Sequence, residues 1–248
     1  DSSTSRGLGD VYKRQPIMTE PKAYIIEFLS DEWTRNCLWT LFIMVAYLFI
    51  GKRVSAKYQL RMGIFISILL ISTTITGHTR NIINGYWNVS DNLPLHLCSV
   101  SNLIACFILF IPKNNRLFEF LYYAGIIGAF QAFFTPQINN FDGTNYEYLE
   151  YYLSHGGIML LPIFMFKNLG YELTKYSWLK VVLYLNILLA IVMPLNFIID
   201  SNYMYLAYVP DVSNPLIIGD WPYYILFWEI ILVILTYILY VISTGKRV

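Results

Sequence analysis

Seven long stretches of apolar residues constrain this chain more than any other feature of its sequence. A helix needs about 20 predominantly apolar residues to cross a hydrocarbon core about 30 Å thick. Stretches of roughly this length lie at Trp33–Ile50, Met62–Thr76, Leu93–Ile111, Leu117–Phe134, Tyr151–Phe166, Trp178–Ile199 and Trp221–Ile242. The charged residues make up 13% of the chain, against about 25% in soluble domains. The sequence therefore predicts an all-α, polytopic membrane protein with seven transmembrane helices.

The first residues differ in character from the rest. Residues 1–17 are mostly polar and contain no apolar core of the kind found in a signal peptide. We interpret them as a disordered, non-native or adaptor-derived tail. We expect residues 18–248 to form a single seven-helix transmembrane domain.

The distribution of basic residues predicts the orientation of the helices. They gather after the first, third and fifth predicted helices and at the C-terminus: Lys52, Arg53, Lys57, Arg61, Lys113, Arg116, Lys167, Lys175, Lys180, Lys246 and Arg247. Because cytoplasmic loops carry an excess of Lys and Arg, the N-terminus is predicted outside and the C-terminus in the cytoplasm. We expect a multi-pass protein of the cell membrane. No basic run suggests a nucleic-acid partner, and the oligomeric state is left open.

Polar side chains concentrate toward the predicted outer ends of the helices. They are His78, Arg80, His96, Cys98, Asn102, Gln131, His155 and Glu229. An ionisable group inside a membrane usually faces a cavity or a partner, so Glu229 is expected to meet Arg80 or a histidine. The pattern predicts a polar cavity that opens outward, and separate interhelical hydrogen bonds are the alternative.

The stretch Leu93–Asn102 carries the densest group of these side chains. Its Pro94 is expected in the first turn of the third helix. A helix N-terminus favours anions, including a thiolate, so Cys98 is a candidate nucleophile. His96 is two residues away and points to another side of a regular helix, so His155 or His78 is the better candidate for the base.

Each of these residues also has a simpler interpretation. Cys98 can be a small packing residue, which is how we interpret Cys37 and Cys106. Most tyrosines and tryptophans, including the Tyr146–Tyr152 cluster, are expected to form an interfacial belt. Three histidines could hold zinc, but none is paired at the i, i+4 spacing, so we predict neither a metal nor another cofactor.

Three segments together resemble a known family. They are Gly77-His78-Thr79-Arg80, Leu93-Pro94-Leu95-His96-Leu97-Cys98-Ser99 and Ser154-His155-Gly156-Gly157, which look like the YwaF-like bacterial integral membrane proteins. That family is similar to the eukaryotic transmembrane-protein-164 acyltransferases and, more distantly, to the androgen-induced membrane hydrolases. The resemblance implies acyl transfer or hydrolysis on a lipid, with His155 matching the family histidine. The eukaryotic Pro-Cys-His motif aligns its cysteine with Leu95, whereas this chain has Cys98.

These observations lead to one main hypothesis and two alternatives. In the main hypothesis Cys98 attacks a lipid ester, with His155 or His78 as base, and Asn102 or Gln131 donates to the oxyanion. His96, Arg80 and Glu229 would complete the binding site for a membrane lipid. The first alternative is a non-catalytic transporter or receptor that binds a small ligand in the outer cavity. The second alternative is a metal-dependent membrane hydrolase.

Overall fold

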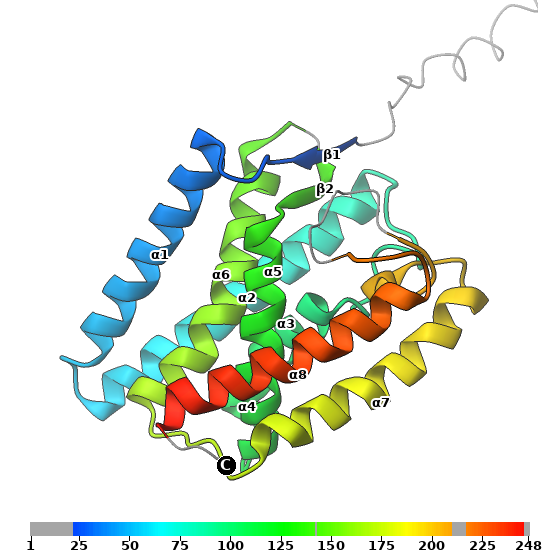
Figure 1. Ribbon diagram of the computed structural model, residues 1–248. Helices are drawn as coiled ribbons and strands as arrows, with labels where there is room; N and C mark the ends of the chain where they lie inside the picture. Colours follow the sequence, from blue (N-terminus) through cyan, green and yellow to red (C-terminus); the bar gives the residue numbers. More distant parts are fainter. Residues whose placement is uncertain (1–21, 142, 210–216, 246–248) are drawn as a thin grey trace, which may run out of the picture.

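The computed structural model describes residues 22–141, 143–209 and 217–245. The predicted tail at 1–17 and the C-terminal pair Lys246–Arg247 lie outside the described residues. Within them, an all-α fold forms from elements that Figure 1 labels. The helices are α1 (Asp31–Gly51), α2 (Ala56–Ile83), α3 (Leu97–Phe107), α4 (Asn115–Phe120), α5 (Ile126–Phe134), α6 (Asn145–Asn168), α7 (Ser177–Ile198) and α8 (Tyr223–Thr244).

A π-helical turn, η2 (Leu121–Gly125), joins α4 and α5, so that Asn115–Phe134 is one continuous helix. Counted in this way, seven helices form at the seven apolar stretches. Five of them are long and apolar enough to cross a membrane: α1, α2, Asn115–Phe134, α7 and α8. The protein is therefore a polytopic membrane protein, while the count of seven spans stays a prediction.

The other two helices depart from the span criterion for different reasons. With the short 3-10 helix η1 (Ile108–Phe110), α3 makes an apolar helix that is shorter than the five spans. Its length of 24 residues would let α6 cross, but its first turns carry Glu147, Glu150 and His155. These polar residues lower its mean hydropathy, although much of the helix is buried inside the protein.

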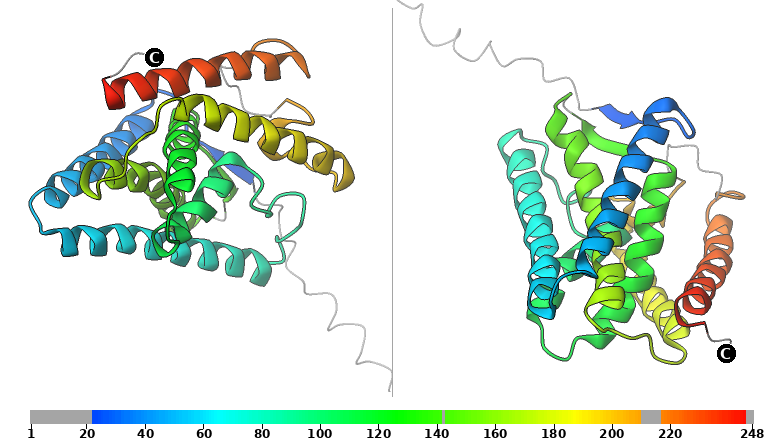
Figure 2. Two further views of the ribbon diagram at one scale, coloured as in Figure 1. Left: turned by 90° about the horizontal axis from the view of Figure 1, so that it is seen from below. Right: turned by 90° about the vertical axis from the view of Figure 1, so that its left-hand side faces the viewer.

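Helix α6 lies at the centre of the bundle and packs against α1, α2, α3 and α5. Figure 2 shows α7 and α8 side by side on one side of the molecule and α2 on the opposite side. Two glycines of α6 face its neighbours, because a Cβ on Gly156 would lie 3.5 Å from Thr40 of α1 and one on Gly157 would lie 2.6 Å from Leu70 of α2. Small residues of this kind let membrane helices approach closely.

The continuous helix α4–η2–α5 approaches α6 equally closely. A Cβ on Gly125 would lie 2.9 Å from the backbone oxygen of Ile158, and all five residues of η2 are buried. A π-turn shifts the helical register by one residue, so η2 sets which face α5 turns toward α3 and α6.

Two short strands close one end of the bundle. Strand β1 (Lys22–Ile25) pairs antiparallel with β2 (Gln137–Phe141), with Tyr24 opposite Ile138. They tie the segment before α1 to the α5–α6 connection. Helix α1 begins just after β1, where the Ser30 side chain accepts a hydrogen bond from the Trp33 N–H at 3.1 Å, as N-cap residues do.

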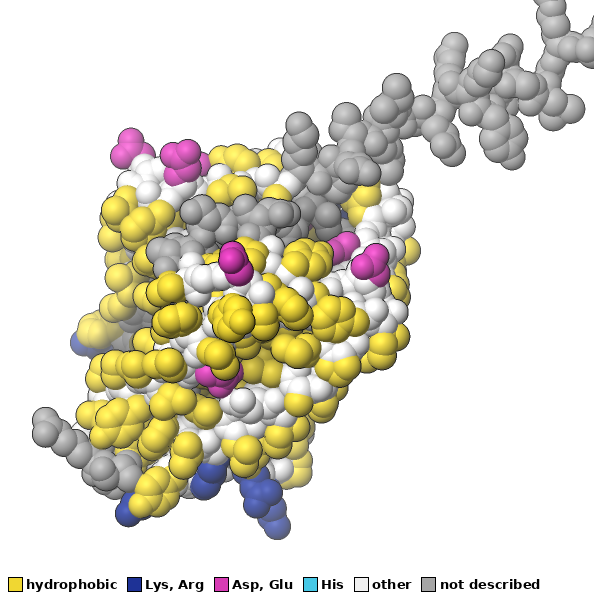
Figure 3. Space-filling model, turned by 45° about the vertical axis from the view of Figure 1, so that its right-hand side comes forward, with side chains coloured by type: hydrophobic (Ala, Val, Ile, Leu, Met, Phe, Trp, Pro, Cys, Tyr) yellow, Lys and Arg dark blue, Asp and Glu magenta, His cyan; other side chains and the backbone are white. Residues whose placement is uncertain are grey.

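Charged side chains separate to the two ends of the bundle. Figure 3 shows Lys and Arg side chains at the lower end of the visible face and most Asp and Glu side chains toward the upper end. We call the end that carries β1 and β2 the strand end. The loops in which the sequence gathers Lys and Arg thus lie at one end of the bundle. This arrangement agrees with the predicted orientation, which stays a prediction.

The start of α3 corrects one expectation. The helix begins at Leu97 rather than at Leu93, so Pro94 lies in the preceding turn and not in the first helical turn. The Leu93 N–H is held at 2.8 Å by the Tyr203 hydroxyl, and His96 has extended backbone angles at the N-cap position. Contacts with a distant segment therefore delay the helix by about one turn.

The close approach at Gly125 gives a testable prediction for stability. We expect Gly125→Ala to destabilise the protein by about 1–3 kcal/mol, because the added methyl group would meet a backbone oxygen that cannot move aside. The matched control is Gly77→Ala in α2, where no atom lies within 4 Å of the new Cβ. The control should stabilise by about 0.5–1 kcal/mol through helix propensity. Denaturant unfolding in detergent would measure both, and equal effects would contradict the packing.

Candidate functional site

Cys98 lies where α3, α5 and α6 meet near the strand end. It is the second residue of α3 and is half-buried. Its Sγ faces α5, because a Cβ on Gly128 would lie 3.4 Å from that sulfur. Because glycine has no side chain, the space between Gly128 and the Cys98 sulfur stays open.

His155 enters the same junction from α6. Its Nδ1 lies 2.8 Å from the Tyr151 carbonyl oxygen one turn earlier. Because a carbonyl oxygen can only accept, Nδ1 carries the proton and donates it. The tautomer with a protonated Nδ1 leaves the lone pair on Nε2. His155 is therefore held in the form in which a neutral imidazole can accept a proton.

Tyr151 links these two residues. Its ring lies 4.3 Å from the His155 ring, centroid to centroid, and its hydroxyl donates at 2.7 Å to the Ala132 carbonyl oxygen of α5. Ala132 lies one helical turn beyond Gly128, the residue that faces Cys98. Cys98 of α3 and His155 of α6 thus both lie against α5, and Tyr151 ties His155 to that helix.

Asn102 and Gln131 flank this junction. The Asn102 amide donates at 2.7 Å to the Thr74 hydroxyl of α2, while its Oδ1 is buried and accepts no hydrogen bond from the described residues. Gln131 is half-buried on α5, three residues after Gly128. Three residues is nearly one helical turn, so Gln131 lies above Gly128 on the same side of α5.

The segment that follows α7 covers the start of α3, and we call this segment the cover. This segment contains the short helix η3 (Tyr203–Tyr205), and the Met204 N–H donates at 3.2 Å to His96 Nδ1. Tyr203 is fully buried beside His96, with ring centroids 5.1 Å apart. Burial raises the pKa of the Tyr203 hydroxyl, which donates to the Val89 carbonyl oxygen at 2.8 Å. His96 therefore anchors this cover.

Asn196, near the end of α7, holds the cover from the other side. Its Oδ1 accepts hydrogen bonds from the Tyr203 N–H and the Ser201 hydroxyl, and its Nδ2 donates to the Tyr203 carbonyl oxygen, all at 2.8–2.9 Å. The backbone of this segment has positive φ at Asp200 and Met204, a conformation that costs free energy in residues with side chains. The Asn196 hydrogen bonds offset that cost.

His78 and Arg80 lie outside the junction. His78 Nδ1 accepts a hydrogen bond from the Trp87 indole at 3.0 Å, in the connection between α2 and α3. Arg80 forms an ion pair with Glu147 of α6 at 3.1 Å and lies over the Tyr146 ring. Arg80 thus joins the ends of α2 and α6.

Glu229 also lies apart, on α8. Its carboxylate accepts a hydrogen bond from Asn186 of α7 at 2.8 Å. The expectation that Arg80 or a histidine pairs with Glu229 is wrong, because α8 packs mainly on α7 and an amide there supplies the hydrogen bond. In the described part of the chain, no three His, Cys, Asp or Glu side chains are grouped as metal ligands.

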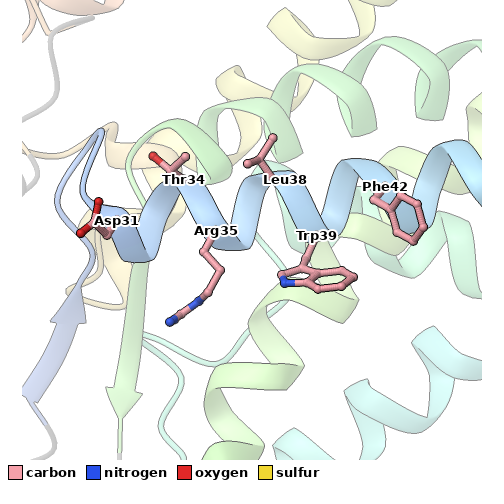
Figure 4. Close-up of a pocket in the computed structure, with 6 residues that line it drawn as sticks. All are labelled: Asp31, Thr34, Arg35, Leu38, Trp39 and Phe42. Carbon is pink, nitrogen blue, oxygen red and sulfur yellow. The ribbon is translucent and has the colours of Figure 1, made fainter.

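A shallow groove of about 590 Å³ lies elsewhere, along the face of α1 that Figure 4 shows. It is lined by Asp31, Thr34, Arg35, Leu38, Trp39 and Phe42. The opposite face of α1 packs on the bundle, where the Trp33 indole donates to the Phe133 carbonyl oxygen at 2.7 Å. The groove therefore lies on the face of α1 that points away from the bundle and from Cys98 and His155.

Sequence reasoning missed three contributors to this junction. Tyr151 was included in the interfacial belt, although its i, i+4 spacing from His155 pointed to a shared face. Gly128 lies within an apolar helix, where the sequence pattern does not distinguish a glycine that faces a thiol from one that faces lipid. The cover formed by Tyr203 and Asn196 depends on contacts between distant segments, and its sequence shows no pattern that predicts them.

The room beside Cys98 can be tested by chemical labelling. We expect Gly128→Ala to slow alkylation of Cys98 about tenfold or more, because the added methyl group would fill the space at van der Waals distance from Sγ. Mass spectrometry of the Cys98 peptide after timed exposure to a membrane-permeant maleimide would measure the rate. Labelling of Cys37, on α1, is the internal control, and an unchanged Cys98 rate would contradict this packing.

Comparison with known proteins places the chain in a family. Curated proteins and solved structures yielded no match. The TMEM164 family matches over residues 28–240, which covers α1 to α7 and most of α8. The chain belongs to the TMEM164 family.

Proposed function

We propose that this protein transfers or hydrolyses an acyl group of a membrane lipid, with Cys98 as nucleophile and His155 as general base. Members of the TMEM164 family are linked to lipid acyltransferase activity. The observation that carries the proposal is the hydrogen bond from His155 Nδ1 to the Tyr151 carbonyl oxygen. It leaves Nε2 able to accept a proton at the junction that also contains a thiol.

The proposed reaction has two steps. In the first, His155 Nε2 takes the Cys98 proton, the sulfur attacks the ester carbonyl carbon, and a C–S bond replaces the ester C–O bond. The leaving alkoxide receives the proton from His155. In the second, an acceptor hydroxyl or water gives its proton to His155 and attacks the thioester, and the Cys98 thiolate leaves and is reprotonated.

Backbone groups at the start of α3 support this placement of the nucleophile. The first N–H groups of a helix have no intrahelical acceptor, and the His96 side chain makes no capping hydrogen bond to them. These N–H groups can stabilise the oxyanion that forms beside Cys98. Gln131 is the better placed of the two predicted side-chain donors, since the Asn102 amide already bonds to Thr74.

The position that the eukaryotic motif assigns to cysteine has a different environment. Leu95 packs in the small apolar cluster around Val192, Tyr203 and Leu206, beneath the cover. Cys98, one turn further along, faces Gly128 instead. The thiol of this chain therefore lies closer to α5 and α6, on which His155 and its partners are carried.

The proposed location follows from the charge pattern. We propose that the strand end faces outward from the cell membrane and that the basic end faces the cytoplasm, as the distribution of Lys and Arg favours. The lipid would then react in the outer leaflet. His78, Arg80 and Glu229, each engaged with another partner, have no role in this proposal.

The proposal predicts the behaviour of three variants in lipid nanodiscs. The assay supplies a phospholipid with a fluorescent acyl chain and a lysophospholipid acceptor, and measures labelled phospholipid and free fatty acid by chromatography. Cys98→Ala should abolish both products, and His155→Gln should lower the rate about 10²–10⁴-fold, the usual contribution of a general base. Cys37→Ala is the control and should keep the full rate.

A covalent intermediate gives a second measurement. Acid-quenched wild-type protein should carry the fluorescent acyl chain on the Cys98 peptide, released by neutral hydroxylamine as thioesters are. Full activity in Cys98→Ala would contradict the nucleophile. Product formation in that variant together with full dependence on His155 would point to a different nucleophile at the same junction.

A further inference from the structure

The side chain of Tyr151 makes contacts that an interfacial tyrosine does not need. It is 8% exposed, its ring lies 4.3 Å from the His155 ring at a tilt of 39°, and its hydroxyl donates to the Ala132 carbonyl oxygen of α5 at 2.7 Å. Ala132 lies one turn beyond Gly128, the residue that faces Cys98. One turn of helix is about 5.4 Å, so the Tyr151 anchor and the thiol share one face of α5.

The His155 side chain needs such a contact. Its Nδ1 donates to the Tyr151 carbonyl oxygen at 2.8 Å and lies 3.4 Å from the Ser154 hydroxyl, and both partners belong to its own helix. Contacts at this one nitrogen leave the ring free to turn about it. On the other side, the Phe133 ring makes a wider, edge-on contact at 6.4 Å. The Tyr151 ring, at 4.3 Å, therefore limits the tilt of the imidazole more than any other ring contact the structure records for His155.

We propose that Tyr151 is the positioning residue of His155. Its carbonyl oxygen selects the tautomer with the proton on Nδ1, its ring fixes the plane of the imidazole, and its hydroxyl anchors both to α5, the helix that faces the thiol. The catalytic role of this positioning rests on the proposed function, in which His155 is the general base. The orientation of His155 is a physical property that can be measured without any activity.

NMR of protein with ¹⁵N-labelled histidine tests the proposal directly. The chain has three histidines, so single His→Gln variants assign the signals. Wild-type His155 should show a protonated Nδ1 and an unprotonated Nε2. Tyr151→Leu removes the ring and the hydroxyl but keeps the carbonyl oxygen. The imidazole, no longer held in plane, should then leave that oxygen part of the time, so the two nitrogens should give averaged signals. Tyr151→Phe keeps the ring and should give an intermediate result.

The matched control is Tyr152→Phe. Tyr152 is the next residue, and its hydroxyl accepts a hydrogen bond from Asn36 of α1 at 3.0 Å. Its ring packs on Phe133 of α5, a contact that Tyr152→Phe keeps. This variant should lose a comparable contact between helices and leave the His155 signals unchanged. A general loss of packing would instead disturb His155 in both variants, or lower the melting temperature without changing the tautomer.

The activity assay supplies the second readout. We expect kcat to fall about tenfold in Tyr151→Phe and about a hundredfold in Tyr151→Leu, with KM nearly unchanged, since the residue acts through His155. Wild-type His155 signals together with a wild-type rate in Tyr151→Leu would overturn the proposal. If Cys98→Ala stays active while Tyr151→Leu averages the His155 signals, the positioning role stands and the proposed nucleophile fails.

Discussion

The close packing of neighbouring helices on α6 is the contact on which the rest of the structure depends. Lipid tails are as apolar as leucine, so membrane helices gain little by burying apolar side chains against one another and associate through tight packing instead. Gly156 and Gly157 of α6 and Gly125 of the α4–η2–α5 helix supply that packing, with backbone and side chains in direct contact. The three contacts fix α6 against α1, α2 and η2. They also set the height at which His155 meets α5.

This central position explains the polarity of α6. In a helix that contacts lipid on all sides, acids and a histidine would have a high free-energy cost. Helix α6 avoids this cost because its neighbours enclose it. Glu147 is neutralised by Arg80, and the Tyr148 and Tyr152 hydroxyls hydrogen-bond with Asn36 of α1. The same enclosure lets the helix carry a hydrogen-bonded imidazole at the junction. Low hydropathy in a helix of this length therefore marks the core of the bundle rather than a surface segment.

The sequence predicted the number and the approximate position of the helices. The reason is that a long apolar stretch in lipid forms a helix whatever its neighbours are. It did not predict the late start of α3, the strand pair or the cover over the junction, since these depend on partners distant in the chain. For the candidate site, the roles of Cys98 and His155 stay predictions, while the expected pairing of Arg80 with Glu229 is wrong. Both lie near helix ends at a similar predicted depth, and depth alone does not say which face of a helix meets which neighbour.

The depth of Cys98 fits the chemistry proposed for it. The hydrocarbon core is about 30 Å thick and the bilayer with its headgroup regions about 40–45 Å, so the ester groups of a phospholipid lie at the boundary between the two. Cys98 is in the first turn of a helix that starts beneath a cover of polar and aromatic residues. With α3 across the membrane as proposed, the Cys98 sulfur would lie near that boundary. A thiol in the middle of a span would meet only acyl chains, and one in a loop would meet only headgroups. In the proposed orientation, the delayed start of α3 beside Tyr203 and His96 would set the level at which the thiol meets an ester.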